Sequence, residues 1–201
     1  MTEERTLESI VLRGKHVQLE PYTESHLPEL WQVGNHEELW RYMPIEMSTE
    51  RDMASLLQHL LSMARAGVAQ GFAQRALEDD TVVGGTCYLN YDRTNHRVEI
   101  GATWITPQRQ RSAINTEAKL LLLTHAFETL QCMRVEFKTD ALNAGSQTAL
   151  DRIGAKKEGT LRAHMIMPDG RFRDSVYYSI LLNEWPGVKK QLTRRVNTRS
   201  H

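Results

Sequence analysis

Two strand-like segments, residues 98–106 and 135–139, flank a helical run at residues 115–130, and this order constrains the fold most. Apolar residues recur along the run at the spacing of one helix face. A helix that joins two strands of one sheet makes them a parallel pair. Short polar connections elsewhere predict hairpins. The sequence therefore predicts a parallel pair inside a mostly antiparallel sheet.

The remaining segments follow from periodicity and turn chemistry. Alternation predicts an early strand at residues 10–12 and 16–20, and Thr23 can cap a helix after it. A helix is expected at residues 49–66, and Pro44 should keep the connection 39–44 from being helical. The other expected elements are strands 69–77, 82–91, 159–167 and 173–182, and a helix at 146–153. The fold class is α/β (α+β), in the order β-α-α-β-β-β-α-β-α-β-β.

Length and charge limit the organisation and the partners. The 201 residues fit a polar extension (1–9), one domain (10–187) and a basic, solvated, partly disordered tail (188–201). Lysine plus arginine equals aspartate plus glutamate, 25 each, so no net field attracts nucleic acid. No apolar run of about 18 residues and no secretion signal is present, so we expect no membrane partner and a cytoplasmic protein.

Reactive side chains are sparse. Cys87 and Cys132, the two cysteines, are expected to be packed thiols in a reducing compartment. The histidines lack metal-ligand spacing, so no metal is predicted.

The segment from Pro107 to Thr116 joins the first strand of the parallel unit to its helix. Backbone N–H groups at a helix N-terminus and the helix dipole favour anions, and Arg109 and Arg111 add charge-assisted donors. Asn115 and Thr116 can cap the helix or donate to a ligand. A phosphate site is predicted here, and an exposed Arg-rich loop with a capped helix is the alternative.

The order of these elements and nine local motifs resemble the GNAT N-acetyltransferase superfamily, and within it the ribosomal-protein-alanine N-acetyltransferase branch. The likeness covers about residues 10–187. The matching residues are 98–101, 107–119, 126–128, 134–136, Asn143 with Ser146, 154–155, 158–159, 173–175 and 184–185.

The resemblance implies a splayed parallel pair that binds acetyl-coenzyme A, with its diphosphate on loop 110–116 and its pantetheine arm between the strands. Diverging strands leave unpaired backbone groups that the arm's amides can match. The implied contacts are Trp104, Ile105, Arg109, Arg111, Ser112, Ala113, Ile114, Asn115, Thr116 and Asn143. Ala113 and Asn115 depart from the small residues that the family carries there. Alanine tolerates positive φ poorly, so the loop should keep helical dihedrals or open wider.

Glu99 is the candidate general base. Alternation places Glu99 on the cleft side of its strand, opposite Val98, Ile100, Ala102 and Trp104, which should face the core helix. The resemblance implies that this acid, through a water, accepts a proton from the attacking amine. A cross-strand ion pair with Arg97, Lys138 or another cation is the alternative.

Ser146 is the best candidate to hydrogen-bond the departing sulfur, because Leu150 stands where many relatives carry a tyrosine acid. Helix capping by Asn143 or Ser146 competes with this interpretation. Trp40 and Tyr42 could wall an acceptor pocket or simply cover the core. His164 could contact the amine, or be ordinary hairpin polarity.

We therefore expect an acyltransferase that moves acetyl from acetyl-coenzyme A to a primary amine by direct attack, the acceptor being a protein N-terminal α-amine or a small amine. A non-catalytic acyl-coenzyme A sensor or scaffold of the same fold is the main alternative. A nucleic-acid module that uses the basic tail has less support. The sequence leaves the oligomeric state open, a homodimer included.

Overall fold

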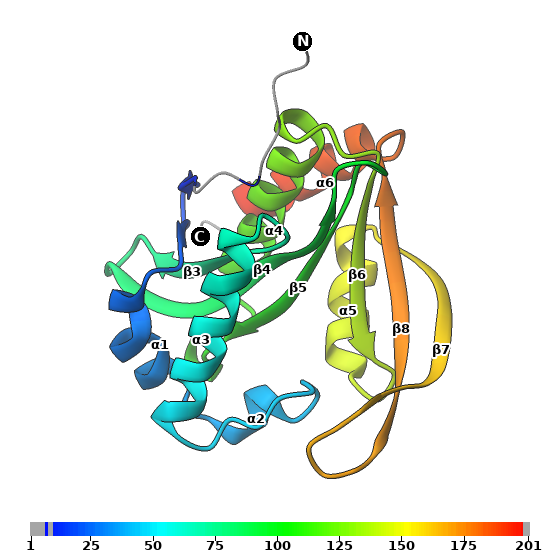
Figure 1. Ribbon diagram of the computed structural model, residues 1–201. Coiled ribbons are helices and arrows are strands. Elements are labelled where there is room, and N and C mark those ends of the chain that lie inside the picture. Colours follow the sequence, from blue (N-terminus) through cyan, green and yellow to red (C-terminus); the bar gives the residue numbers. More distant parts are fainter. Residues whose placement is uncertain (1–6, 8–9, 199–201) are drawn as a thin grey trace.

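The computed structural model describes residue 7 and residues 10–198, so the predicted extension 1–9 lies outside it apart from Leu7. One sheet carries helices on both faces (Figure 1). Its strands are β1 (Leu12–Arg13), β2 (Val17–Pro21), β3 (Gln70–Ala76), β4 (Thr81–Asp92), β5 (Arg97–Ile105), β6 (Arg134–Asp140), β7 (Lys156–Ile166) and β8 (Phe172–Leu181). The α-helices are α1 (Leu27–Gly34), α2 (Glu37–Trp40), α3 (Glu50–Arg65), α4 (Ile114–Thr124), α5 (Ala144–Ile153) and α6 (Trp185–Thr198). Short 3-10 turns at Glu24–His26 and Pro107–Arg109 and a π-helical turn at His125–Thr129 complete the elements.

The sheet has eight strands in the order β1-β2-β3-β4-β5-β6-β8-β7. Every neighbouring pair is antiparallel except β5 and β6. This arrangement confirms the predicted meander, the parallel pair around α4 and the closing hairpin. Gly154 ends α5 with a φ of 89°, the left-handed conformation that glycine adopts without steric cost.

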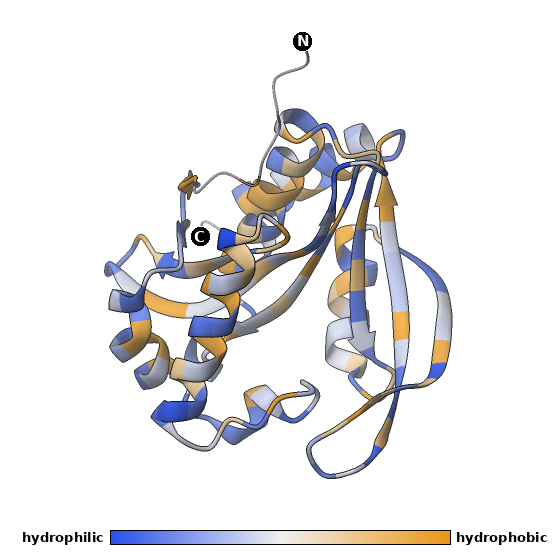
Figure 2. Ribbon diagram, viewed as in Figure 1, coloured by the Kyte–Doolittle hydropathy of each residue, from blue (hydrophilic) through white to orange (hydrophobic). Residues whose placement is uncertain are grey.

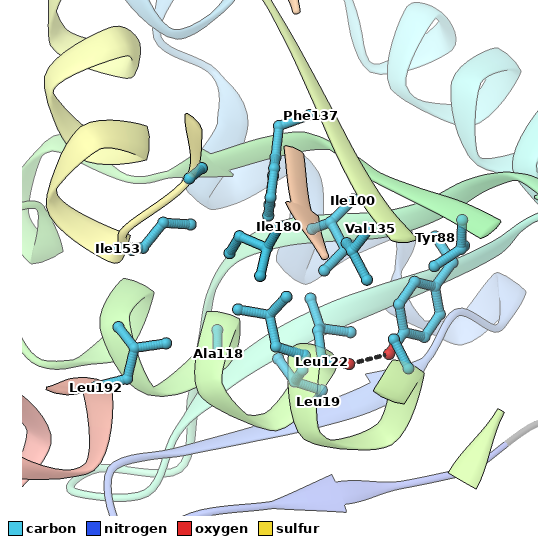
Figure 3. Close-up of a cluster of buried hydrophobic side chains, with 14 of the residues drawn as sticks. Leu19, Tyr88, Ile100, Ala118, Leu122, Val135, Phe137, Ile153, Ile180 and Leu192 are labelled. Carbon is cyan, nitrogen blue, oxygen red and sulfur yellow. Dashed lines mark hydrogen bonds between the residues drawn. The ribbon is translucent and has the colours of Figure 1, made fainter. Parts of the chain in front are cut away.

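Two hydrophobic cores lie on opposite faces of the sheet. The larger core includes Val98, Ile100 and residues of α4, α5 and α6 (Figure 3). The smaller core packs α1 and α3 against the other face. In Figure 2, hydrophilic and hydrophobic residues recur in turn along α3, as a helix with one buried face requires. The active-site strands are thus supported from both sides.

The predicted alternation along β5 is wrong after Gly101. Gly101 pairs with Cys87, but Trp104 pairs with Gly85, so β5 carries one extra residue between these two pairs. Ala102 has a φ of 46° at this bulge. An extra residue reverses the faces of the side chains that follow it. Trp104 therefore packs in the smaller core, opposite Val98 and Ile100.

The predicted solvated tail from residue 188 is also wrong over its described part. Residues 185–198 form α6, and its apolar side chains at positions 185, 188, 192 and 196 are buried. The expected non-helical connection 39–44 needs a smaller correction, because α2 extends to Trp40. A proline ring clashes with the carbonyl four residues before it, so Pro44 ends this helix rather than preventing it.

Candidate active site

Strands β5 and β6 separate shortly after they pair. Their register joins only residues 97–99 with 134–136. Farther along, β5 pairs with β4 alone and β6 with β8 alone among the described residues. Figure 1 shows the two strands diverging from this point. The facing edges carry backbone donors and acceptors without a strand partner, which a ligand built of amides could match.

The loop into α4 keeps helical dihedrals at Ala113, with φ −70° and ψ −20°, which confirms the first of the two predicted options. Arg111 carries the strain instead, with a φ of 61°. The predicted cap is wrong, because α4 begins at Ile114 with Ala113 as its N-cap residue. The Ser112 hydroxyl lies 3.3 Å from the Ile114 N–H nitrogen and accepts from it. Asn115 and Thr116 therefore lie within the first helical turn.

Two features describe the loop's capacity for a ligand. An open pocket of about 680 Å³ lies beside it, lined by Arg109, Arg111 and Ser112 together with Lys15, His16, Ala76, Leu77, Glu78, Ala113, Ile114 and Thr198. The side-chain carbonyl oxygen of Asn115 is buried and has no hydrogen-bond partner among the described residues. Arg109 is less available than predicted, because Glu78 and Asp79 both pair with its guanidinium.

Glu99 stands where β5 and β6 part. It is only 4% exposed, and its carboxylate accepts a hydrogen bond from Asn90 Nδ2 at 2.9 Å. The Lys138 ammonium lies 3.6 Å from the same oxygen, so the predicted cross-strand ion pair forms. A Cβ on Gly101 would come within 3.1 Å of the other oxygen, so this glycine leaves room for the carboxylate. Asn90 and Lys138 fix the side chain and favour its charged form.

Asn143 caps α5: its Oδ1 accepts from the Ser146 N–H at 2.9 Å. The Ser146 hydroxyl forms no hydrogen bond with any residue in the described part of the chain and is partly exposed. Leu150 is buried in the larger core. The cap therefore belongs to Asn143, and the Ser146 hydroxyl remains available to a ligand.

The three residues predicted to contact the acceptor differ in their surroundings. Trp40 is buried in the smaller core, its indole N–H donates to Gly34 O at 2.8 Å, and its ring lies 5.2 Å from that of Trp104. This burial favours the core-covering alternative for Trp40. Tyr42 is half-buried, and its carbonyl accepts a hydrogen bond from Arg173. His164 is exposed and lies 3.0 Å from the Ser175 hydroxyl.

Sequence reasoning missed Arg173 as a site residue. The side chain is 4% exposed, and the pKa of its guanidinium is lowered by burial, with Glu99 and Asp140 among the charges that act on it. Tyr177 lies nearby on β8, and its pKa is raised by burial and by Glu99. A strand arginine between polar neighbours gives no sequence signal of burial. Its cover comes from a distant segment.

Both thiols are buried, as predicted. Burial raises the pKa of Cys87 to about 12 and that of Cys132 to about 12, so both stay protonated near neutral pH. The described residues contain no group of three or more His, Cys, Asp or Glu side chains placed to hold a metal ion. None of the helices in this part of the chain has the length and apolar character needed to span a bilayer.

The sequence profile of the acetyltransferase (GNAT) domain matches residues 16–156. The chain belongs to this family of acetyltransferases. It is 35% identical over 119 residues to the Bacillus subtilis (strain 168) protein named "Putative ribosomal N-acetyltransferase YdaF", a match that covers 59% of this chain and 64% of that protein.

Solved structures agree with this assignment. One, described as "Crystal structure of putative acetyltransferase" and from T. thermophilus, is 37% identical, with a TM-score of 0.83 over 92% of this chain and 96% of that one. Mycobacterium smegmatis RimJ in complex with CoA-disulfide has a TM-score of 0.78 over 91% of this chain and 90% of that one. At 23% identity the RimJ likeness shows the fold alone.

Proposed function

We propose that this acetyltransferase moves the acetyl group of acetyl-coenzyme A directly onto a primary amine, with Glu99 as general base. The observation that carries the proposal is the place of Glu99, the last residue of β5 that pairs with β6. A carboxylate there lies beside the open strand edges. An amine that attacks a thioester between the strands would have this acid within reach, directly or through one water.

The diverging edges and the α4 loop support binding of the acyl donor. Pantetheine contains two amides, which the backbone groups of β5 and β6 can pair as a surrogate strand. Arg111, the N–H groups of the first turn of α4 and the unpartnered Asn115 side chain suit a diphosphate and its neighbouring polar groups. Coenzyme A in the structure of M. smegmatis RimJ adds support from a protein of the same fold.

An α-amine is the acceptor that fits a modest base. Deprotonating a lysine-like amine at pH 7 costs roughly 5 kcal/mol, whereas an α-amine costs about 1 kcal/mol. A Glu99 carboxylate held by Asn90 and Lys138 is a modest base, so it suits the second task. The ribosomal N-acetyltransferase name of the B. subtilis relative points to the same class, a protein N-terminal α-amine.

Ser146 is proposed to donate a hydrogen bond to the departing thiolate. A thiol with a pKa near 8.5 is a fair leaving group, so one hydroxyl is sufficient help. The buried, protonated Cys87 and Cys132 argue against a covalent acyl-cysteine intermediate and support direct attack.

Calorimetric titration with acetyl-coenzyme A, followed by thiol release with a panel of amines, tests the proposal. Glu99→Gln should retain binding and lose about 100- to 10,000-fold in kcat, the range expected for a general base. Glu136→Gln is the matched control, because Glu136 lies opposite Glu99 but pairs with Arg97 and Arg134. Unchanged turnover of Glu99→Gln from pH 6 to 9 would remove the assignment. Binding without turnover of any amine would favour the sensor alternative.

A further inference from the structure

Arg173 on β8 holds a buried positive charge with little compensation. Its Nη1 donates to the carbonyl oxygen of Tyr42 at 3.2 Å. Its Nε is buried and has no hydrogen-bond partner among the described residues. Arg173 also forms no salt bridge within that part of the chain. A buried, unpaired guanidinium is costly, so its persistence calls for a ligand that supplies the missing charge.

The carboxylates nearest to Arg173 already have other cations. Glu99 pairs with Lys138, and Asp140 pairs with Arg171 at 2.6 Å. Glu136 on the same strand as Lys138 pairs with Arg97 and Arg134. Two matched pairs and one unmatched arginine therefore share this corner of the site. The missing counter-charge must come from outside the described residues.

The orientation of Arg173 leaves one side of its guanidinium available. Nη1 is used by Tyr42, whereas Nε and Nη2 make no hydrogen bond with any described residue. These two nitrogens form the side-on fork that binds both oxygens of a carboxylate. Figure 1 shows the connection after α2 reaching toward the β7–β8 hairpin, and Tyr42 in this connection holds the arginine in place.

We propose that the Nε and Nη2 edge of Arg173 binds a carboxylate of the acceptor while the acceptor's amine faces Glu99. This inference rests on the proposed function and narrows its substrate class to amines that carry a carboxylate. Glu99 and Arg173 act on each other electrostatically, so the two groups share one site. The carboxylate has two sources: the α-carboxylate of a free amino acid, or an acidic side chain next to a peptide N-terminus.

Two matched pairs of acceptors test the proposal and separate the sources. The first pair is a tripeptide amide that begins Ala-Glu and its Ala-Gln counterpart. The second pair is alanine and alaninamide. The wild-type enzyme should prefer the carboxylate member of at least one pair by about 10- to 100-fold in kcat/KM, the value of one or two charge-assisted hydrogen bonds. The preferred pair identifies the source.

Arg173→Gln should abolish this preference and leave the neutral acceptors within about threefold of wild type. Arg162→Gln is the control, because Arg162 is an exposed arginine of the same hairpin. Equal rates for both members of both pairs in the wild type, or a preference that survives in Arg173→Gln, would overturn the inference. If no amine releases coenzyme A from the wild type, the proposed function fails instead.

A second measurement does not depend on turnover. Arg173→Met removes the unmatched charge at similar volume, so its unfolding midpoint without ligand should rise relative to wild type. A structural role for Arg173 predicts the opposite, a lower midpoint. Calorimetric titration of the acceptor pairs should show carboxylate-dependent binding to wild type and to Arg162→Gln, and none to Arg173→Met. A fall in the midpoint together with unchanged carboxylate binding would overturn the proposal even if the enzyme proved inactive.

Discussion

The ammonium nitrogen of Lys119 lies 2.7 Å from the hydroxyl oxygen of Thr103, beneath the bulge of β5. Thr103 in turn lies 2.8 Å from the Thr86 hydroxyl. Lys119 is buried on α4, and this burial lowers the pKa of its ammonium to about 7. A lysine in the core is thus held by two threonine hydroxyls in place of a carboxylate.

Replacing Lys119 should stabilise the protein. Between pH 7 and 9 the unfolded chain holds a proton on Lys119 that the folded chain increasingly lacks, so stability from this group rises with pH. Below pH 7 the full cost of the buried charge is present. Lys119→Met should gain about 1–4 kcal/mol, most at low pH, and flatten this slope, as urea unfolding at pH 6, 7, 8 and 9 would measure.

Lys157→Met, an exposed change on β7, is the control and should leave the slope as in wild type. Thr103 retains Thr86 after the Lys119 change, so no buried hydroxyl loses its last partner. An identical slope in wild type and Lys119→Met would contradict the assignment.

Glu117 joins the N-terminal strands to α4. Its carboxylate is buried and accepts backbone hydrogen bonds from Lys15, His16 and Val17 at 2.8, 2.6 and 2.9 Å. Removing it leaves three N–H groups without their acceptor, so Glu117→Ala should cost about 3–5 kcal/mol in urea unfolding. Glu46→Ala, at an exposed position, should change stability by less than about 0.5 kcal/mol. Equal effects of the two changes would show that the three contacts contribute nothing.

Local sequence patterns were sufficient for the sheet but not for every face of it. The parallel β5–β6 pair follows from one helix between two strands, and that prediction is confirmed. The side of Trp104 could not be predicted, because the bulge depends on the backbone at Ala102 and its pairing with β4. Burial of Arg173 depends on Tyr42, which is 131 positions away in the chain. Contacts of that range leave no periodic signal.

The C-terminal helix shows the opposite case. Its buried residues at 185, 188, 192 and 196 follow helical spacing that is visible in the sequence, but the basic residues between them suggested a solvated tail. Leu192 is fully buried, so Leu192→Ala should cost about 2–5 kcal/mol and lower the unfolding midpoint. Lys190→Ala, on the exposed side of α6, should have little effect. A small loss at Leu192 would restore the tail interpretation.

Asn143 and Ser146 should separate stability from catalysis. Asn143 supplies the cap of α5, so Asn143→Ala should cost about 1 kcal/mol in unfolding. Ser146 contributes only its backbone N–H to that cap, so Ser146→Ala should leave stability within about 0.5 kcal/mol. If its hydroxyl assists the leaving thiolate, Ser146→Ala should lower kcat by about tenfold, the value of one hydrogen bond to a developing charge. Steady-state thiol release and urea unfolding on both variants measure the two effects. A Ser146→Ala variant that loses stability but retains kcat would assign Ser146 to the helix alone and leave the departing sulfur without a protein donor from α5.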